Sequence, residues 1–107
     1  MEDISLFNPT AMKKFQVTIQ FTMDEEFMSL IPEHRKYVDA LIEKNIIDQY
    51  AVSMESQTIW ITISSDSKAE IEEYLSGSPL YRYWQYKISE LVVLDGLLHR
   101  LPAVRLN

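Results

Sequence analysis

The chain has 107 residues, a length typical of one domain, and its 16 acidic and 10 basic side chains give a net charge of −6. Phosphate backbones repel an acidic protein that has no basic cluster, so we expect no nucleic-acid binding. The absence of cysteine excludes disulfides, thiolate nucleophiles and cysteine metal sites.

The first predicted element is a strand. Residues 1–13 are expected to form an N-terminal arm, which starts acidic and lacks the long apolar core of a signal peptide. Residues 14–22 alternate between polar and apolar side chains, a period typical of a strand with one dry face. No apolar run in the chain approaches the ~18 residues of a membrane span. We therefore expect a cytoplasmic protein with no membrane contact.

Pro32 divides the helical segment that follows. Acidic residues at 24–26 suit the start of a helix. A proline deep inside a helix removes a hydrogen bond, so we expect a first turn or two over 24–30 and a main helix over 32–44. Asn45 suits a left-handed cap at its C-terminal end.

Two strands come next. Residues 46–55 predict a strand with Ile46, Tyr50 and Val52 on one face. Residues 58–64, TIWITIS, give the strongest strand pattern of the chain, with three isoleucines on alternate positions.

A second helix and a last strand complete the pattern. Residues 65–67 cap a helix predicted over 67–76, which Gly77 and Pro79 end. Residues 82–93 predict the last strand. The C-terminal tail over 95–107 is apolar enough to dock elsewhere.

This order of elements predicts an α+β protein. Residues 14–94 would form a ferredoxin-like βαββαβ domain with an antiparallel sheet and both helices on one face. The opposite face, here called the open face, would carry Gln16, Thr18, Gln20, Trp60 and Thr62. Aromatic and uncharged polar side chains suit sheet-to-sheet packing or a pocket. We expect a homodimer or higher oligomer that forms an α+β barrel with a cavity in each protomer; an interface without a cavity is the alternative.

Four segments between residues 14 and 91 resemble the dimeric α+β barrel superfamily, in particular muconolactone isomerase and the YCII-related proteins. The segments are KFQVTIQF, HRKYVDALIEKN, TIWITIS and SGSPLYRYWQYKISEL. In muconolactone isomerase the second helix also ends in a Ser-Gly-x-Pro-Leu-aromatic turn, and Tyr37 has a counterpart. In the YCII-related family a histidine occurs early in the first helix, where this chain has His34. Ser78 stands where that family has an aspartate.

His34 is the main candidate for acid–base chemistry. It is one of two histidines and lies three residues from both Ile31 and Tyr37, on the inner side of the predicted helix. Imidazole titrates near neutral pH and can move a proton on the carbon beside a carbonyl. The alternative is a core histidine that is hydrogen-bonded to backbone or to a tyrosine.

Other candidates would support catalysis or bind the ligand. Tyr37 would assist His34, and Arg35 would hold a carboxylate. Trp60, Tyr81 and Tyr83 would contact a planar or lactone-like ring. Packing, interface or surface roles are the alternatives for each of these residues.

The sequence offers no local metal or phosphate site. Its two histidines are far apart, and its two glycines form no phosphate loop, so we expect neither a metal nor a cofactor. The resemblance implies an isomerase-like, cofactor-free proton transfer on a small lactone or unsaturated carboxylic compound. The alternative is a non-catalytic protein of the same fold that binds a small ligand or serves in assembly, which the serine at position 78 favours.

Overall fold

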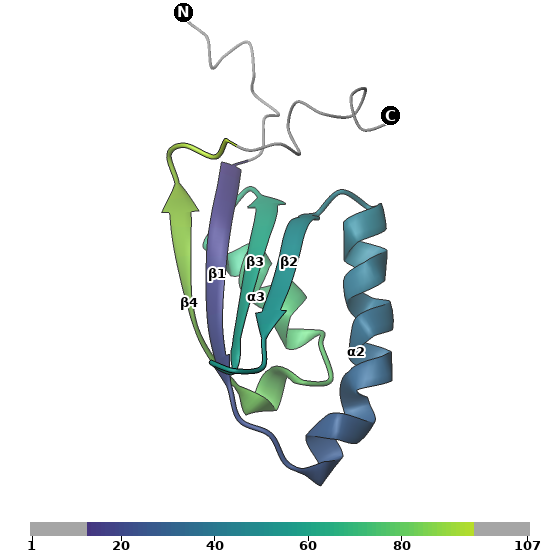
Figure 1. The fold of residues 1–107 in the computed structure, drawn as a ribbon. Coiled ribbons are helices and arrows are strands. Elements are labelled where there is room, and N and C mark those ends of the chain that lie inside the picture. The colour runs from purple at the N-terminus through teal and green to yellow at the C-terminus, as the bar shows by residue number, and fades with distance from the viewer. Residues whose placement is uncertain (1–12, 96–107) are drawn as a thin grey trace, which may run out of the picture.

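In the computed structural model, which describes residues 13–95, four strands and two α-helices follow one another in the order βαββαβ (Figure 1). The elements are β1 (Lys13–Phe21), α2 (Glu25–Glu43), β2 (Ile47–Ser53), β3 (Thr58–Ser65), α3 (Lys68–Ser76), a 3₁₀ turn η1 (Tyr81–Tyr83) and β4 (Trp84–Leu91). None of the helices within these residues is long and apolar enough to cross a membrane. The predicted N-terminal arm and C-terminal tail lie outside the described residues, except for Lys13 and Asp95.

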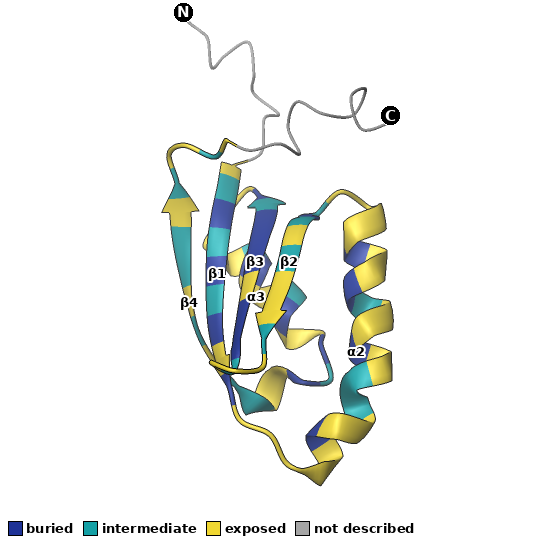
Figure 2. Ribbon diagram, in the orientation of Figure 1, coloured by how far each residue is buried: buried dark blue, intermediate teal, exposed yellow. Residues whose placement is uncertain are grey.

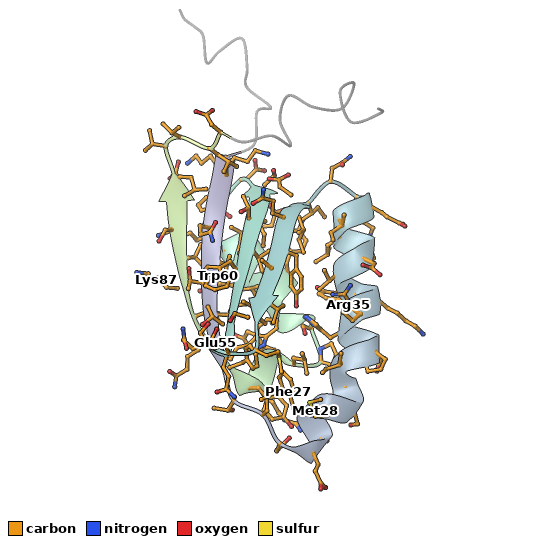
Figure 3. All side chains as sticks on the ribbon, viewed as in Figure 1. Phe27, Met28, Arg35, Glu55, Trp60 and Lys87 are labelled. Carbon is orange, nitrogen blue, oxygen red and sulfur yellow. The ribbon has the colours of Figure 1, made fainter. Side chains whose placement is uncertain are left out.

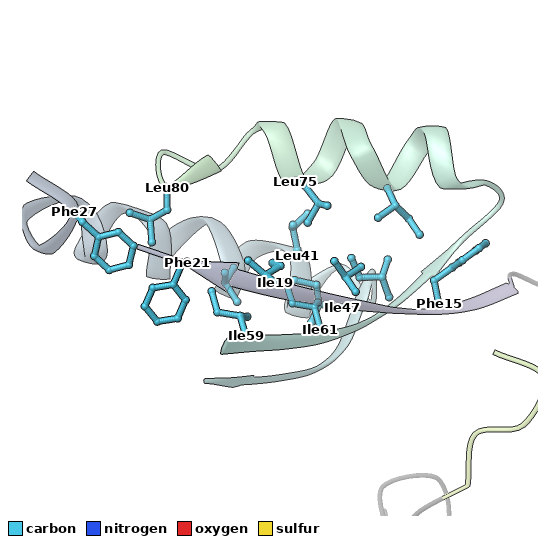
Figure 4. Close-up of a cluster of buried hydrophobic side chains, with 14 residues drawn as sticks. Phe15, Ile19, Phe21, Phe27, Leu41, Ile47, Ile59, Ile61, Leu75 and Leu80 are labelled. Atoms are coloured by element: carbon cyan, nitrogen blue, oxygen red, sulfur yellow. The ribbon is translucent and has the colours of Figure 1, made fainter. Parts of the chain in front are cut away.

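The strands form one antiparallel sheet in the order β2-β3-β1-β4. Val17 of β1 pairs with Ile61 of β3 on one side and with Ile88 of β4 on the other. Both helices lie on the same side of the sheet, and the buried apolar side chains fill the space between the helices and the sheet (Figure 4). The predicted ferredoxin-like α+β fold is therefore confirmed.

The two central strands, β1 and β3, supply half of the buried apolar residues of the core. Their alternate side chains point to the helices and are almost fully buried, as the dark bands along β1 and β3 show (Figure 2). The strand residues of the core are Phe15, Val17, Ile19, Phe21, Ile47, Ile59, Ile61 and Ile63, and the helices and the following loop add Phe27, Val38, Leu41, Ile71, Leu75 and Leu80. Burial of this apolar area is the main driving force for the fold.

Helix α2 does not break at Pro32, contrary to the prediction. It runs without interruption from Glu25 to Glu43. Its first turns are fixed from outside the helix, because Asp24 caps the backbone N–H of Phe27 and the Phe27 ring stacks on Phe21 at 5.4 Å. This tertiary packing offsets the hydrogen bond that Pro32 removes. As predicted, Asn45 follows the helix in the left-handed region, with φ of 64°.

The strands at the sheet edges differ from the predicted alternation. In β2 the pairing shifts between Ile47 and Gln49, so Ile47 and Tyr50 share the helix-facing side although one number is odd and the other even. Strand β4 starts at Trp84 rather than at residue 82, because residues 81–83 form the 3₁₀ turn.

The open face is confirmed as the side of the sheet that the helices leave uncovered (Figures 1 and 3). Trp60 lies there with 38 % of its surface exposed. Beside it the polar side chains pair across strands: the Thr62 hydroxyl donates to Gln16 at 3.1 Å and the Gln20 amide donates to Thr58 at 3.0 Å. On the open face the cross-strand neighbours of Trp60, Thr18 and Ala51, are uncharged. Charged groups lie farther out: Lys87 is in register beyond Thr18, and Lys14 pairs with Asp48 at 2.9 Å.

Candidate functional site

His34 lies on the inner side of α2 and is only 3 % exposed. Its Nδ1 is 2.7 Å from the Ser78 hydroxyl, in the loop that follows α3, and its Nε2 is 2.6 Å from the Tyr50 hydroxyl on β2. One imidazole therefore connects three separate elements. The predicted inward position of His34 is confirmed.

Burial makes this cluster electrically neutral. The loss of water around the ring, together with the nearby charge of Arg35, lowers the pKa of His34 to about 4. The same desolvation raises the pKa of the Tyr50 hydroxyl to about 12, against a small opposing effect of Arg35. At neutral pH the imidazole is uncharged and the phenol keeps its proton.

A groove of about 230 Å³ opens between α2 and the strands β2 and β3, and we call it the α2–β2 groove. Its lining is Phe21, Phe27, Ile31, His34, Arg35, Tyr50, Val52, Met54, Ile59 and Leu80. Only three of these side chains are polar, and the others form an apolar wall. Figure 3 shows Arg35 on α2 directed toward β2. The groove therefore joins an apolar body to one polar end, a combination typical of small-molecule sites.

On its other side His34 borders a smaller cavity of about 20 Å³. The edge of Trp84 meets the imidazole here, with ring centroids 5.7 Å apart. The Trp84 Nε1 atom is buried and has no hydrogen-bond partner among the described residues. Tyr37 also lines this cavity, whereas it is absent from the lining of the α2–β2 groove.

Tyr37, the predicted partner of His34, faces α3. Its hydroxyl donates to the backbone carbonyl of Tyr74 at 2.7 Å. Gly77 lies beneath the phenol ring, and a Cβ at that position would overlap the Tyr37 hydroxyl. The glycine is therefore required for this close approach, since its φ of −79° is open to any residue.

The remaining predicted ligand-binding residues are dispersed. Arg35 reaches the α2–β2 groove, but Trp60 lies on the open face. Tyr81 is exposed, with its hydroxyl 3.2 Å from that of Tyr86. The Tyr83 hydroxyl donates to Asp24 at 2.9 Å, at the start of α2. His34 and Arg35 are thus the two predicted site residues that meet in one groove.

Sequence reasoning did not identify the two hydrogen-bond partners of His34. Tyr50 was assigned only to a strand face, and the irregular pairing that fixes its position has no clear sequence signal. Ser78 lies between Gly77 and Pro79, which end the predicted helix, and this position alone predicts no contact with His34. The one sequence signal for this contact is the predicted resemblance, which sets Ser78 opposite an aspartate of the YCII-related family. In this structure a side chain at position 78 does reach the His34 imidazole.

No protein-family model matches this chain, and no curated protein matches it significantly. The resemblance to muconolactone isomerase and the YCII-related proteins therefore stays a prediction beyond the level of the fold. Within residues 13–95, no three histidine, aspartate or glutamate side chains are placed to hold a metal ion.

Proposed function

We propose that the α2–β2 groove binds a small carboxylic compound with an apolar body. The observation that carries this proposal is that Arg35 and Tyr50 line, together with His34, a groove whose other side chains are apolar. The guanidinium would pair with the carboxylate, and the hydroxyl would contact a second oxygen. The apolar wall would cover the body of the ligand. A volume of about 230 Å³ favours a small compound.

Binding is tested by calorimetric titration with cyclohexanecarboxylate and cyclopentenecarboxylate. We expect saturable binding that weakens about tenfold or more in Arg35→Met, which keeps the apolar stem of the side chain and removes its charge. Lys36→Met removes an exposed charge at the next position and serves as the matched control. Equal affinity in wild type and Arg35→Met would contradict the proposed carboxylate contact.

A second candidate function is isomerisation of the bound compound by proton transfer, and the short contact of 2.6 Å between His34 and Tyr50 favours it. A hydrogen beside the ligand carbonyl would leave as a proton to the Tyr50 oxygen while the Tyr50 proton passes to Nε2 of His34. An enolate on the ligand and an imidazolium on His34 would result. Return of the proton to another carbon would complete the isomerisation.

Incubation of the ligand in deuterated water separates these two functions. Catalysis predicts deuterium at the carbon beside the carbonyl at a rate above that of buffer, with loss of this rate in His34→Gln. Binding without catalysis predicts no incorporation above the buffer rate.

The open face supports a proposal about assembly. We propose that two copies pack through their open faces, because Trp60 is exposed there between the uncharged cross-strand neighbours Thr18 and Ala51. Light scattering at micromolar concentration is expected to give a dimer for wild type and a monomer for Trp60→Glu. Ile42→Glu, at an exposed site on α2, is the control that should stay dimeric. A monomeric wild-type protein would contradict this proposal.

A further inference from the structure

We infer that Ser78 holds His34 in the tautomer that carries its proton on Nε2, and that Tyr50 consequently directs its own hydroxyl proton into the α2–β2 groove. The ligand class that this arrangement recognises is a compound with a carbonyl or carboxylate oxygen at the Tyr50 end. This inference deepens the proposed binding function and rests on it for the identity of the ligand.

The argument begins at the Ser78 hydroxyl, which is buried with 6 % of the residue exposed. Its oxygen accepts the backbone N–H of Leu80 at 3.0 Å and lies 2.7 Å from Nδ1 of His34. Among residues 13–95, Nδ1 is the one acceptor within reach of the serine proton. A proton on Nδ1 would leave the serine proton buried with no acceptor, which is costly. Ser78 therefore donates to Nδ1, and Nδ1 carries no hydrogen.

A neutral imidazole carries one proton, so this proton lies on Nε2. The ring is neutral because it is buried. Nε2 then donates to the Tyr50 oxygen at 2.6 Å. Because Tyr50 accepts this hydrogen bond, its own phenolic proton is not used in the contact with His34 and can be donated to another group.

The free proton of Tyr50 has one open direction. Its hydroxyl has no second hydrogen-bond partner in the described part of the chain, and the ring lines the α2–β2 groove beside Arg35. The burial that keeps the phenol protonated makes it a donor throughout the neutral range. The side chains at the polar end of the groove therefore present a neutral donor, the Tyr50 hydroxyl, and a cation, Arg35.

These groups select the ligand. A carbonyl or carboxylate oxygen can accept from Tyr50 and is attracted by Arg35, whereas an ammonium group is repelled by the charge of Arg35. In this tautomer Nε2 is already protonated, so His34 is a positioning residue that orients Tyr50. The arrangement thus favours binding over a reaction in which Nε2 receives the proton.

The tautomer is measured on the full-length wild-type chain, without any ligand, by long-range nitrogen–proton correlation NMR with ¹⁵N-histidine. His99→Asn assigns the signals, since the chain has two histidines. We expect a pyrrole-like Nε2 and a pyridine-like Nδ1 for His34. A pyrrole-like Nδ1 would overturn the inference even if the groove binds carboxylates.

The ligand class is tested with three probes: cyclohexanecarboxylate, cyclohexanone and cyclohexylamine. The carboxylate and the ketone are expected to bind, the amine is not, and Tyr50→Phe should weaken cyclohexanone binding about tenfold through the loss of one hydrogen bond. Unchanged affinity for cyclohexanone in Tyr50→Phe would overturn the donor role. Failure of all three probes to bind, with the Nε2 proton in place, would overturn the binding function and leave the tautomer established.

Discussion

Two polar networks attach α2 to the rest of the molecule, and they differ in their surroundings. The buried network joins His34 to Ser78 and Tyr50 through neutral groups. The exposed network, at the start of α2, joins Arg82 to Glu26 by an ion pair of 2.7 Å. It continues from Arg82 to the Tyr83 hydroxyl and from there to Asp24.

The number of hydrogen bonds in a network does not measure how much that network stabilises the protein. In the exposed network water and salt can replace each partner, and ion pairs in such a setting contribute little. In the buried network the loss of one partner leaves a buried polar group without a hydrogen bond, so the cost to stability is large. We therefore expect substitution of His34 to lower the stability of the protein more than substitution of Arg82 does. We also expect His34 to determine how stability changes with pH.

The largest expected effect comes from His34→Ala. The change leaves a cavity and removes the partners of two hydroxyls, so the free energy of unfolding should fall by about 3–4 kcal/mol in urea titrations. Glu33→Ala, at an exposed position next to it on the same helix, should change the stability little. A loss in His34→Ala no greater than in Glu33→Ala would remove the distinction between the networks.

The titration of His34 should also make the free energy of unfolding depend on pH. The pKa of His34 is about 4 in the folded protein, below the usual 6.5 of a solvated histidine, so the unfolded chain binds the proton more readily. The contribution of neutral His34 is fully present above pH 6.5, declines as the pH falls below that value, and is fully lost below about pH 4. The total is about 3 kcal/mol.

Unfolding measured between pH 7 and pH 4 tests this slope, with His34→Gln as the comparison because glutamine does not titrate. The difference in stability between the two proteins should narrow as the pH falls. Parallel stability curves would contradict the low pKa of His34.

Gly77→Ala tests the loop side of the buried network. The added methyl group would displace the Tyr37 ring and, with it, the loop that positions Ser78. Overpacking of this kind should cost about 1–2 kcal/mol in thermal or urea unfolding. Ser76→Ala, at the exposed preceding position, is the control and should cost less.

The smallest effect is expected in the exposed network. Arg82→Gln removes the ion pair with Glu26 and the hydrogen bond to Tyr83. The unfolding midpoint should fall slightly at low salt, and the difference from wild type should vanish at high salt because the ion pair is already screened there. A large difference that persists at high salt would show that the two networks are equivalent.

The regular parts of the fold were predictable from the sequence. The alternation in residues 14–22 and 58–64 gave the central strands, and the spacing of Ile31, His34 and Tyr37 placed the histidine on the inner side of α2. The continuity of α2 through Pro32 was not predictable, because it depends on tertiary contacts of Phe27. A periodic sequence pattern predicts a helix or strand well when one face of that element packs against the core.

The site was predictable only in part. His34 and Arg35 could be identified from one helix, but the hydroxyl groups that complete the cluster come from a strand with shifted pairing and from a loop. Neither location follows a period in the sequence. Trp60, by contrast, was assigned correctly to the open face by the alternation of its strand.

A single NMR titration tests the central claim, that the α2–β2 groove is a binding site for small carboxylic compounds. Cyclohexanecarboxylate would be added to ¹³C-labelled wild type while the methyl signals of Ile31 and Val52 and the indole signal of Trp60 are followed. The account predicts saturable shifts at the two groove residues, weakened in Arg35→Met, and little change at Trp60. Unchanged groove signals, or shifts confined to Trp60, would contradict it.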